Sequence, residues 1–251
     1  MSSGGYHQIV DFVKKQMADH FTLPTCDPSK FVPFWRSRSP FSQWHPCVFE
    51  CKKPILNLVV FGDRNDAKDG KRANPDDTAL GSADPGLDNL GSADPRSPRS
   101  NIIQFTSTEQ YMMYEKAVLF GDTACAKEIL LETRPHAVKK LGRKVRGFDQ
   151  KIWEANRCQI VYEGNLLKFR QNPKLKRALL ETKDRIIVEA SPYDRIWGVG
   201  LSSSDPRIYH PKKWRGKNLL GECLMCVREQ LLREDREAEL HGRSLIDRRI
   251  A

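Results

Sequence analysis

Residues 63–100 constrain the fold more than any other part of this 251-residue chain. The segment is rich in Asp, Gly, Pro, Asn and Ser and contains no aromatic residue. It therefore lacks the apolar surface whose burial would offset the entropy lost on ordering. Within it, Leu80-Gly-Ser-Ala-Asp-Pro85 recurs as Leu90-Gly-Ser-Ala-Asp-Pro95, and two copies are too few for a solenoid. The sequence predicts a flexible insertion in a surface loop of a folded domain.

Hydrophobic spacing around this insertion predicts a mostly helical structure with a few short strands. Thr106 and Glu109 have capping-box spacing at the start of the strongest helix, and Gly121 supplies its stop. Strands are expected at 55–61 and 102–105, and 185–190 has mixed strand and loop character. Helices are expected at 6–21, 109–120, 123–133, 135–141, 149–169, 173–181 and 217–233.

These elements predict a predominantly helical α+β protein with three parts. Residues 1–30 form an N-terminal helix and lead-in. Residues 31–232 form one catalytic domain, interrupted by the flexible insertion at 63–100. Residues 233–251 form a charged C-terminal tail that continues the last helix.

The net charge of +10 is concentrated in residues 127–185, which contain sixteen Lys or Arg against seven Asp or Glu. A basic surface suits a phosphate-bearing partner, and it equally suits a chain kept soluble by charge. No stretch has the ~18 consecutive apolar residues of a membrane span, and the N-terminus has no signal-peptide pattern. Seven cysteines at irregular spacings read as reduced thiols. We therefore expect an intracellular protein, cytoplasmic or nuclear, with no membrane association.

Two of these cysteines, Cys223 and Cys226, form a CxxC that Cys47 and Cys51 could complete as a zinc site. The alternative is that both are small core residues on one helix face. We favour the second interpretation and expect neither a metal nor a cofactor. The Rossmann glycine pattern, the P-loop, HExxH and the serine nucleophile elbow are all missing from the sequence.

Glu109 and Lys116 are seven residues apart on the strongest helix, so they share a face to within about 20° and lie roughly 10 Å apart along its axis. A carboxylate and an amine so placed can flank a ligand. The carboxylate can stabilise positive charge at a glycosidic carbon or activate water, and a desolvated lysine can attack a sugar aldehyde to form an imine. The plain alternative is an exposed Glu and Lys on a helix surface.

Three further clusters could contact a ligand. Asp194 and Trp197-Gly198 lie in a tight loop that could supply a hydrogen-bond acceptor and a stacking face, although the tryptophan could instead fill the core. Arg36 precedes Phe41-Ser42-Gln43-Trp44, a mixture of groups that suits a base or sugar phosphate. Asn218 is expected to cap the last long helix, whose N-terminus could bind a phosphate.

Taken together, these motifs resemble the NADAR/YbiA-like family from about Phe34 to Leu232, with the insertion as an interruption. Any one motif is weak, and seven in the same order are highly specific. They are Phe41-Ser-Gln-Trp44, Ser107-Thr-Glu-Gln-Tyr-Met-Met-Tyr-Glu-Lys116, Lys140-Leu-Gly-Arg143, Phe148 with Trp153 and Arg157, Lys168-Phe169, Asp194-Arg-Ile-Trp-Gly198, and Gly216-Lys-Asn-Leu-Leu-Gly-Glu-Cys-Leu-Met225 with Val227-Arg228.

The resemblance implies N-glycosidase activity without a cofactor, on ADP-ribosyl or ribosylamine linkages. It places the family's active-site glutamate on Glu109, its helix lysine on Lys116, its pocket tryptophan on Trp153 and its acidic loop residue on Asp194. Gln110 and Met113 depart from the His and Gln of many members, so the resemblance carries no role over to these two positions.

The hypothesis is hydrolysis of the bond between ADP-ribose and a guanine base in nucleic acid, with ADP-ribose as product. The expected catalytic residues are Lys116, Glu109 and Asp194. The first alternative is the same chemistry on a phosphorylated ribosylamine of riboflavin biosynthesis. The second is a non-catalytic ADP-ribose or nucleic-acid binding module. The expected substrate-binding residues are Arg36, Phe41, Ser42, Gln43, Trp153, Trp197, Gly198 and Asn218.

Overall fold

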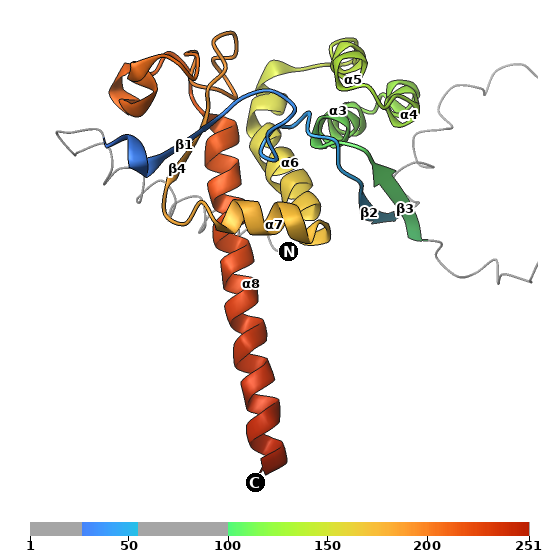
Figure 1. Cartoon of the computed structure of the whole chain (residues 1–251). Coiled ribbons are helices and arrows are strands. Elements are labelled where there is room, and N and C mark those ends of the chain that lie inside the picture. Colours follow the sequence, from blue (N-terminus) through green and yellow to red (C-terminus); the bar gives the residue numbers. More distant parts are fainter. Residues whose placement is uncertain (1–26, 55–99, 251) are drawn as a thin grey trace, which may run out of the picture. The chain divides into compact units, whose positions relative to one another are not determined.

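The computed structural model describes residues 27–54 and 100–250, with side chains for 27–52 and 102–241. Residues 27–51 and 103–250 belong to one compact unit. Its fold is α+β and mostly helical, as the sequence predicts (Figure 1). Its helices are α3 (Thr108–Leu119), α4 (Thr123–Leu131), α5 (Pro135–Gly142), α6 (Gln150–Gln171), α7 (Pro173–Leu180) and α8 (Leu219–Ile250), and its strands are β1 (Phe31–Phe34), β2 (Phe49–Pro54), β3 (Ser100–Phe105) and β4 (Ile186–Glu189).

The strands form two pairs, β1 with β4 and β2 with β3. β1 and β4 are parallel, with Phe31 opposite Ile186 and Phe34 opposite Glu189. A parallel pair needs a long crossover connection, and here the chain from β1 to β4 includes α3 to α7. Because both strands run in one direction, the loops that follow Phe34 and Glu189 leave the pair at the same end.

Helix α3 begins one residue later than the capping-box prediction requires. Ser107, not Thr106, is the N-cap, and its hydroxyl accepts a hydrogen bond from the Gln110 N–H. Gln110 reaches back so that its Oε1 accepts from the Thr106 N–H at 2.8 Å. The reciprocal cap therefore uses Gln110, and Glu109 is left out of it. The predicted stop is present, since Gly121 follows the helix with a φ of +69°.

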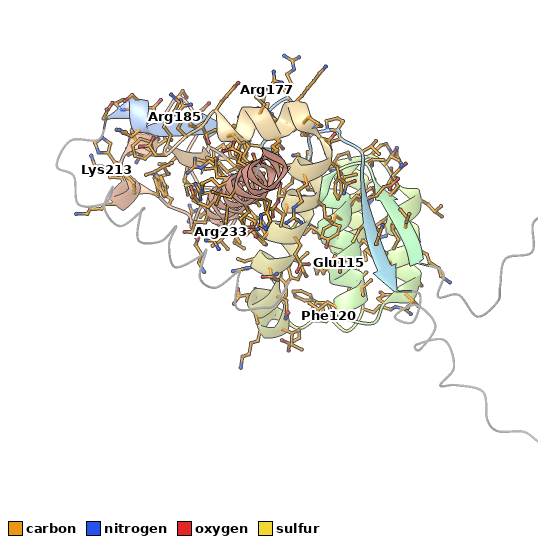
Figure 2. The ribbon with its side chains drawn as sticks, turned by 90° about the horizontal axis from the view of Figure 1, so that it is seen from below. Glu115, Phe120, Arg177, Arg185, Lys213 and Arg233 are labelled. Atoms are coloured by element: carbon orange, nitrogen blue, oxygen red, sulfur yellow. The ribbon has the colours of Figure 1, made fainter. Side chains whose placement is uncertain are left out.

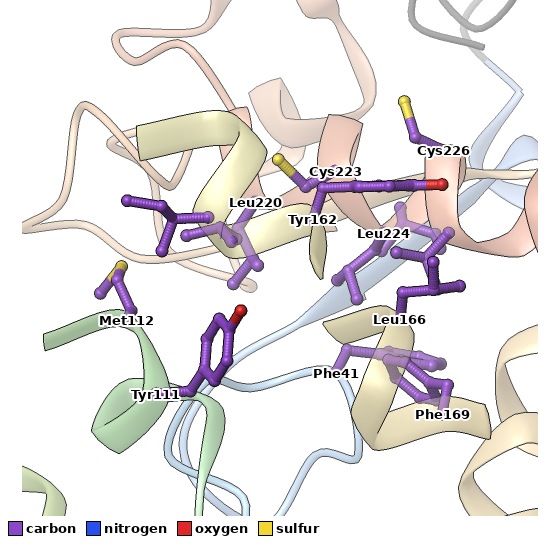
Figure 3. Packing of buried hydrophobic residues seen from close by; sticks show 14 of the residues in the cluster. Phe41, Tyr111, Met112, Tyr162, Leu166, Phe169, Leu220, Cys223, Leu224 and Cys226 are labelled. Carbon is purple, nitrogen blue, oxygen red and sulfur yellow. The ribbon is translucent and has the colours of Figure 1, made fainter. Parts of the chain in front are cut away.

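Helices α6 and α8 pack against each other and supply much of the core. Figure 2 looks nearly along α8, and shows α6 and α7 beside it. Figure 3 shows Tyr162, Leu166 and Phe169 of α6 gathered with Leu220, Cys223 and Leu224 of α8. Side chains are buried along most of α6, which is why its apolar residues do not form a narrow stripe.

The predicted helix at 6–21, the strand at 55–61 and almost all of the insertion at 63–100 lie outside the described residues. The C-terminal segment predicted as a charged tail continues α8 to Ile250. Residues 236–241 on this part of α8 are exposed. Within the described part of the chain, no helix is both long enough and apolar enough to cross a membrane.

Candidate active site

A cavity of about 830 Å³ lies between α3, α5, the first half of α6 and the loops that follow β1 and β4. Its size is in the range of small-molecule sites. Segments far apart in the sequence meet there, because the parallel pairing of β1 and β4 sends both loops to one side. Eight of the eleven residues that the sequence singled out line it: Arg36, Ser42, Gln43, Glu109, Lys116, Trp153, Asp194 and Trp197.

Glu109 is on the first turn of α3, and its residue surface is 3% exposed. Its Oε1 is buried and has no hydrogen-bond partner among the described residues. Burial raises the pKa of the Glu109 carboxyl to about 7, and the nearby Asp194 acts in the same direction. Lys139, Arg143 and a hydrogen bond from the Trp44 side chain oppose this rise. A carboxyl with a pKa near neutrality can both accept and return a proton.

Lys116 is on the last turn of α3 and faces the same cavity. Its Nζ donates a 2.8 Å hydrogen bond to the carbonyl oxygen of Gly142, and it lies 4.2 Å from the ring centre of Phe148 and 5.6 Å from that of Trp153. Burial lowers the pKa of the Lys116 ammonium. Lowering that pKa increases the fraction of free amine, which is the nucleophilic form.

The loop after β4 carries Asp194 and Trp197 to the cavity. Asp194 Oδ1 accepts hydrogen bonds from the N–H groups of Ile196 at 2.9 Å and Trp197 at 2.8 Å. These bonds form a local turn that fixes the carboxylate relative to the tryptophan. The loop can thus present an acceptor and an aromatic face in a set relationship.

The loop after β1 carries Ser42, Gln43 and Trp44 to the cavity, and its backbone is anchored on two helices. The carbonyl of Gln43 accepts the N–H of Glu109 at 2.9 Å, and the carbonyl of Ser42 accepts from Lys168 Nζ at 3.1 Å. Lys168 is completely buried in α6, which lowers its pKa to about 8. Lys168 of the Lys168-Phe169 motif therefore holds the backbone of this loop to α6.

Phe41, Gly198 and Asn218 do not line the cavity. Phe41 is 7% exposed and lies in the core (Figure 3). Its ring is edge-on to that of Phe34, with 5.6 Å between the ring centres. A Cβ at Gly198 would approach the carbonyl oxygen of Glu189 to 2.8 Å, so the glycine allows two backbone segments to pack closely. These residues shape the loops around the site from within the core.

Asn218 directly precedes α8, as expected, but its side chain serves strand β4 and not the helix N-terminus. Its Oδ1 accepts the N–H of Glu189 at 3.0 Å, and its Nδ2 donates to the carbonyl of Ile187 at 2.9 Å. Asn218 is completely buried. Asn218 therefore acts as a bracket that joins the start of α8 to β4. Its side-chain amide forms hydrogen bonds with β4, and it is not directed at a phosphate site at the helix N-terminus.

Several side chains that line the cavity are not among the site residues expected from the sequence. The cations Lys139, Arg143 and Arg157 join Arg36 and Lys116 there, and Glu189 adds an acid. Arg157 is 6% exposed, and one turn separates it from Trp153 on α6. That i, i+4 spacing was a signal that could have found Arg157. Glu189 gave no such signal, because an acid at a strand end has no characteristic spacing.

The two departures from the family pattern are explained differently. The Gln110 side chain faces away from the cavity, and its Nε2 donates to the carbonyls of Ile129 and Glu132 at the end of α4. Met113 lines the cavity.

The two cysteines of the CxxC, Cys223 and Cys226, are buried in α8. The described residues contain no group of three or more His, Cys, Asp or Glu that could hold a metal ion.

Comparisons with known proteins agree with the motifs. The family model described as the NADAR domain matches residues 31–232. N-glycosidase R617 of Acanthamoeba polyphaga mimivirus is 50% identical over 129 residues, which are 51% of this chain and 76% of the viral protein. Protein irg-1 of Caenorhabditis elegans is 35% identical over 203 residues, which are 80% of this chain and 79% of the nematode protein.

A solved structure has the same fold. The NMR structure of the Escherichia coli protein YbiA aligns with a TM-score of 0.52 at 21% identity, and the alignment covers 87% of this chain and 94% of YbiA. At this identity the likeness concerns the fold alone.

Proposed function

Because the chain belongs to the NADAR domain family, we propose that it is an N-glycosidase that hydrolyses the bond between ADP-ribose and a guanine base in nucleic acid. The N-glycosidase class is supported by the family and by the name of the viral relative. One observation supports the mechanism above all. The amine of Lys116, whose pKa burial lowers, shares a cavity with the buried carboxyl of Glu109.

In the proposed reaction, the ribose ring opens as the C1″–O4″ bond breaks and O4″ takes a proton from solvent, which leaves C1″ doubly bonded to the guanine nitrogen. The Lys116 Nζ lone pair then adds to C1″, and the π electrons of that double bond return to the guanine nitrogen. The guanine nitrogen leaves with the electron pair of the C1″–N bond and takes up a proton, and a lysine imine remains. Glu109 accepts the proton that the amine loses and then activates the water that hydrolyses the imine. The products are ADP-ribose, the unmodified base and free Lys116, so one water is consumed overall.

The charge pattern of the cavity supports a diphosphate ligand. Five basic side chains line it against three acidic ones, and burial favours the neutral form of two of those acids. We propose that Arg36 and Arg157 hold the diphosphate, since arginine pairs with phosphate oxygens through two N–H groups. Asp194 would accept from the ribose hydroxyls, and Trp153 and Trp197 would form aromatic walls.

The covalent step is tested with Lys116→Ala and Lys116→Arg on DNA that contains ADP-ribosylated guanosine. Both variants should lose at least about 10²-fold in kcat, because arginine retains the charge and cannot form the imine. Borohydride added during turnover should reduce the wild-type imine to a stable adduct on Lys116. Undiminished turnover by Lys116→Ala, or an adduct on another residue, would overturn the role of Lys116.

The two rival functions make different predictions. A glycosidase for a phosphorylated ribosylamine should bind DNA weakly. An enzyme that acts on modified nucleic acid should bind DNA with an affinity that decreases as several powers of the salt concentration. A binding module should retain ADP-ribose and release no base. Its case is weakened by the location of Lys116 in the same cavity as Glu109, which ligand binding alone would not require. A panel of guanine, thymine and ribosylamine substrates separates the three.

A further inference from the structure

Strand β4 ends with a second acid at the cavity, and this residue is partly buried. Glu189 lines the cavity together with Glu109 and Asp194. Its Oε2 is buried and has no hydrogen-bond partner among the described residues, as is true of Glu109 Oε1. Leaving a carboxyl oxygen buried and unpaired costs folding free energy. Both acids that carry such an oxygen therefore lie in the wall of one cavity.

The backbone of Glu189 is held in place on both sides. Its N–H donates to Asn218 Oδ1 at 3.0 Å. Its carbonyl oxygen accepts from the N–H groups of Ser191 at 2.9 Å and Val199 at 3.0 Å. A residue fixed in this way, on a strand paired with β1, aims its side chain with little freedom. This rigidity is typical of a residue that contacts substrate.

The surroundings of Glu189 favour its neutral, protonated form at pH 7. Burial raises the pKa of its carboxyl to about 8, with smaller contributions in the same direction from the nearby Asp194 and Glu109 and an opposing one from Lys139. Glu109, with a pKa of about 7, is ionised in a larger fraction of molecules. Two acids whose environments separate their proton affinities can divide acid and base work. The other charged side chains that line the cavity are Arg36, Lys116, Arg143 and Arg157.

We propose that Glu189 is a further catalytic residue, the general acid that protonates the departing base. The Glu189 O–H bond breaks and a new N–H bond forms on the base, which leaves with the electrons of the C1″–N bond. Glu189 becomes a carboxylate and takes up the proton that Glu109 accepted from the amine, which leaves Glu109 ionised to activate the water that hydrolyses the lysine imine. The assignment rests on the proposed function, and within it Glu109 is the base.

The kinetic test is Glu189→Gln, which conserves size and removes the acidic proton. At pH 7 its kcat on ADP-ribosylated guanosine DNA should fall about 10²-fold, while its affinity for ADP-ribose changes less than about 3-fold. A general acid must be protonated, so wild-type kcat/KM should fall as pH rises through about 8, and the variant should lack this alkaline limb. Glu128→Gln, on the exposed face of α4, is the matched control and should retain it.

A structural role for Glu189 would lower the rate equally at every pH and leave the alkaline limb in place, which would overturn the assignment. Infrared spectroscopy gives an independent measurement. The carbonyl stretch of a protonated carboxylic acid should be present at pH 7 in the wild type and weaker in Glu189→Gln. Its absence overturns the inference whether or not the protein cleaves the substrate. A wild type that shows the band and releases no guanine contradicts the proposed function instead.

Discussion

Lys116 at the end of α3 is joined to Gly142 at the end of α5 by the hydrogen bond from Nζ to the carbonyl oxygen, at 2.8 Å. The same glycine packs against α3, because a Cβ there would lie 2.0 Å from Met113 Sδ. One position therefore sets both the spacing of the two helices and the place of the amine.

Gly142→Ala should disturb the site through this packing. The added methyl group must displace Met113 or move α5, which should lower stability by about 1–3 kcal/mol and shift the acceptor of Lys116. We expect a fall in kcat that exceeds the fall in ADP-ribose affinity. In the double variant with Met113→Ala, the loss in unfolding free energy should be smaller than the sum of the losses in the two single variants. Additive effects would mean that the contact with Met113 is not the cause.

Glu109→Gln should abolish turnover and stabilise the fold at alkaline pH. The pKa of Glu109 is about 7 in the folded protein and near 4.5 when unfolded, so the folded wild type loses stability as pH rises through this range. The variant avoids that loss. Its free energy of unfolding should exceed the wild-type value by on the order of 3 kcal/mol above pH 8, and by nothing below pH 4.5.

Urea unfolding at pH 4.5, 6 and 8.5 measures this difference. Glu128→Gln, which changes an exposed carboxylate, should show no comparable dependence on pH. A Glu109→Gln variant that is less stable than the wild type at pH 8.5 would contradict the burial of an ionised Glu109.

Trp44→Phe should move the acidic limb of the pH profile. The hydrogen bond from the Trp44 side chain lowers the pKa of Glu109, and phenylalanine cannot donate it. The pKa of Glu109 should then rise, so the base form is reached at higher pH. The midpoint of the acidic limb of kcat/KM should shift upward while the alkaline limb stays in place. An unmoved acidic limb would mean that Glu109 is not the group that titrates there.

Asn218→Ala and Asn218→Gly should separate two contributions to stability. Both variants lose the side-chain hydrogen bonds to Ile187 and Glu189. Asn218 has a φ of +56°, which glycine adopts freely and alanine adopts at a cost of roughly 1–2 kcal/mol. Denaturant unfolding should therefore find the alanine variant less stable than the glycine variant by about this amount. Equal stabilities would mean that the backbone relaxes when the bracket is lost.

The helices of this fold were predictable because their signals are local. Pro135 and Pro173 begin α5 and α7, Asp149 caps α6, and Gly121 ends α3. The cap of α3 was placed one residue early because Thr106 and Ser107 have similar side chains, and tertiary contacts select between them. Gln110 adds to that selection, since it also binds the end of α4.

The cavity was predictable only where its residues share an element or a motif. Glu109 and Lys116 are on one helix, and Asp194 and Trp197 are in one loop. Glu189 reaches the same cavity through the pairing of β1 with β4, which no local pattern encodes. Phe41 and Gly198 belong to the right motifs and serve as packing, because a sequence motif does not distinguish a residue that touches a ligand from one that supports its neighbour.

The two ends of α8 should evolve at different rates. At its start, a Cβ at Gly221 would lie 2.2 Å from the carbonyl oxygen of Ile187, and Asn218 binds the same strand. Substitutions there would disturb β4 at Ile187, two residues from Glu189. Residues 236–241 are exposed, so their substitutions should be nearly neutral for the cavity. Among relatives we expect the first turns of α8 to be almost invariant and the distal turns to drift in sequence and length.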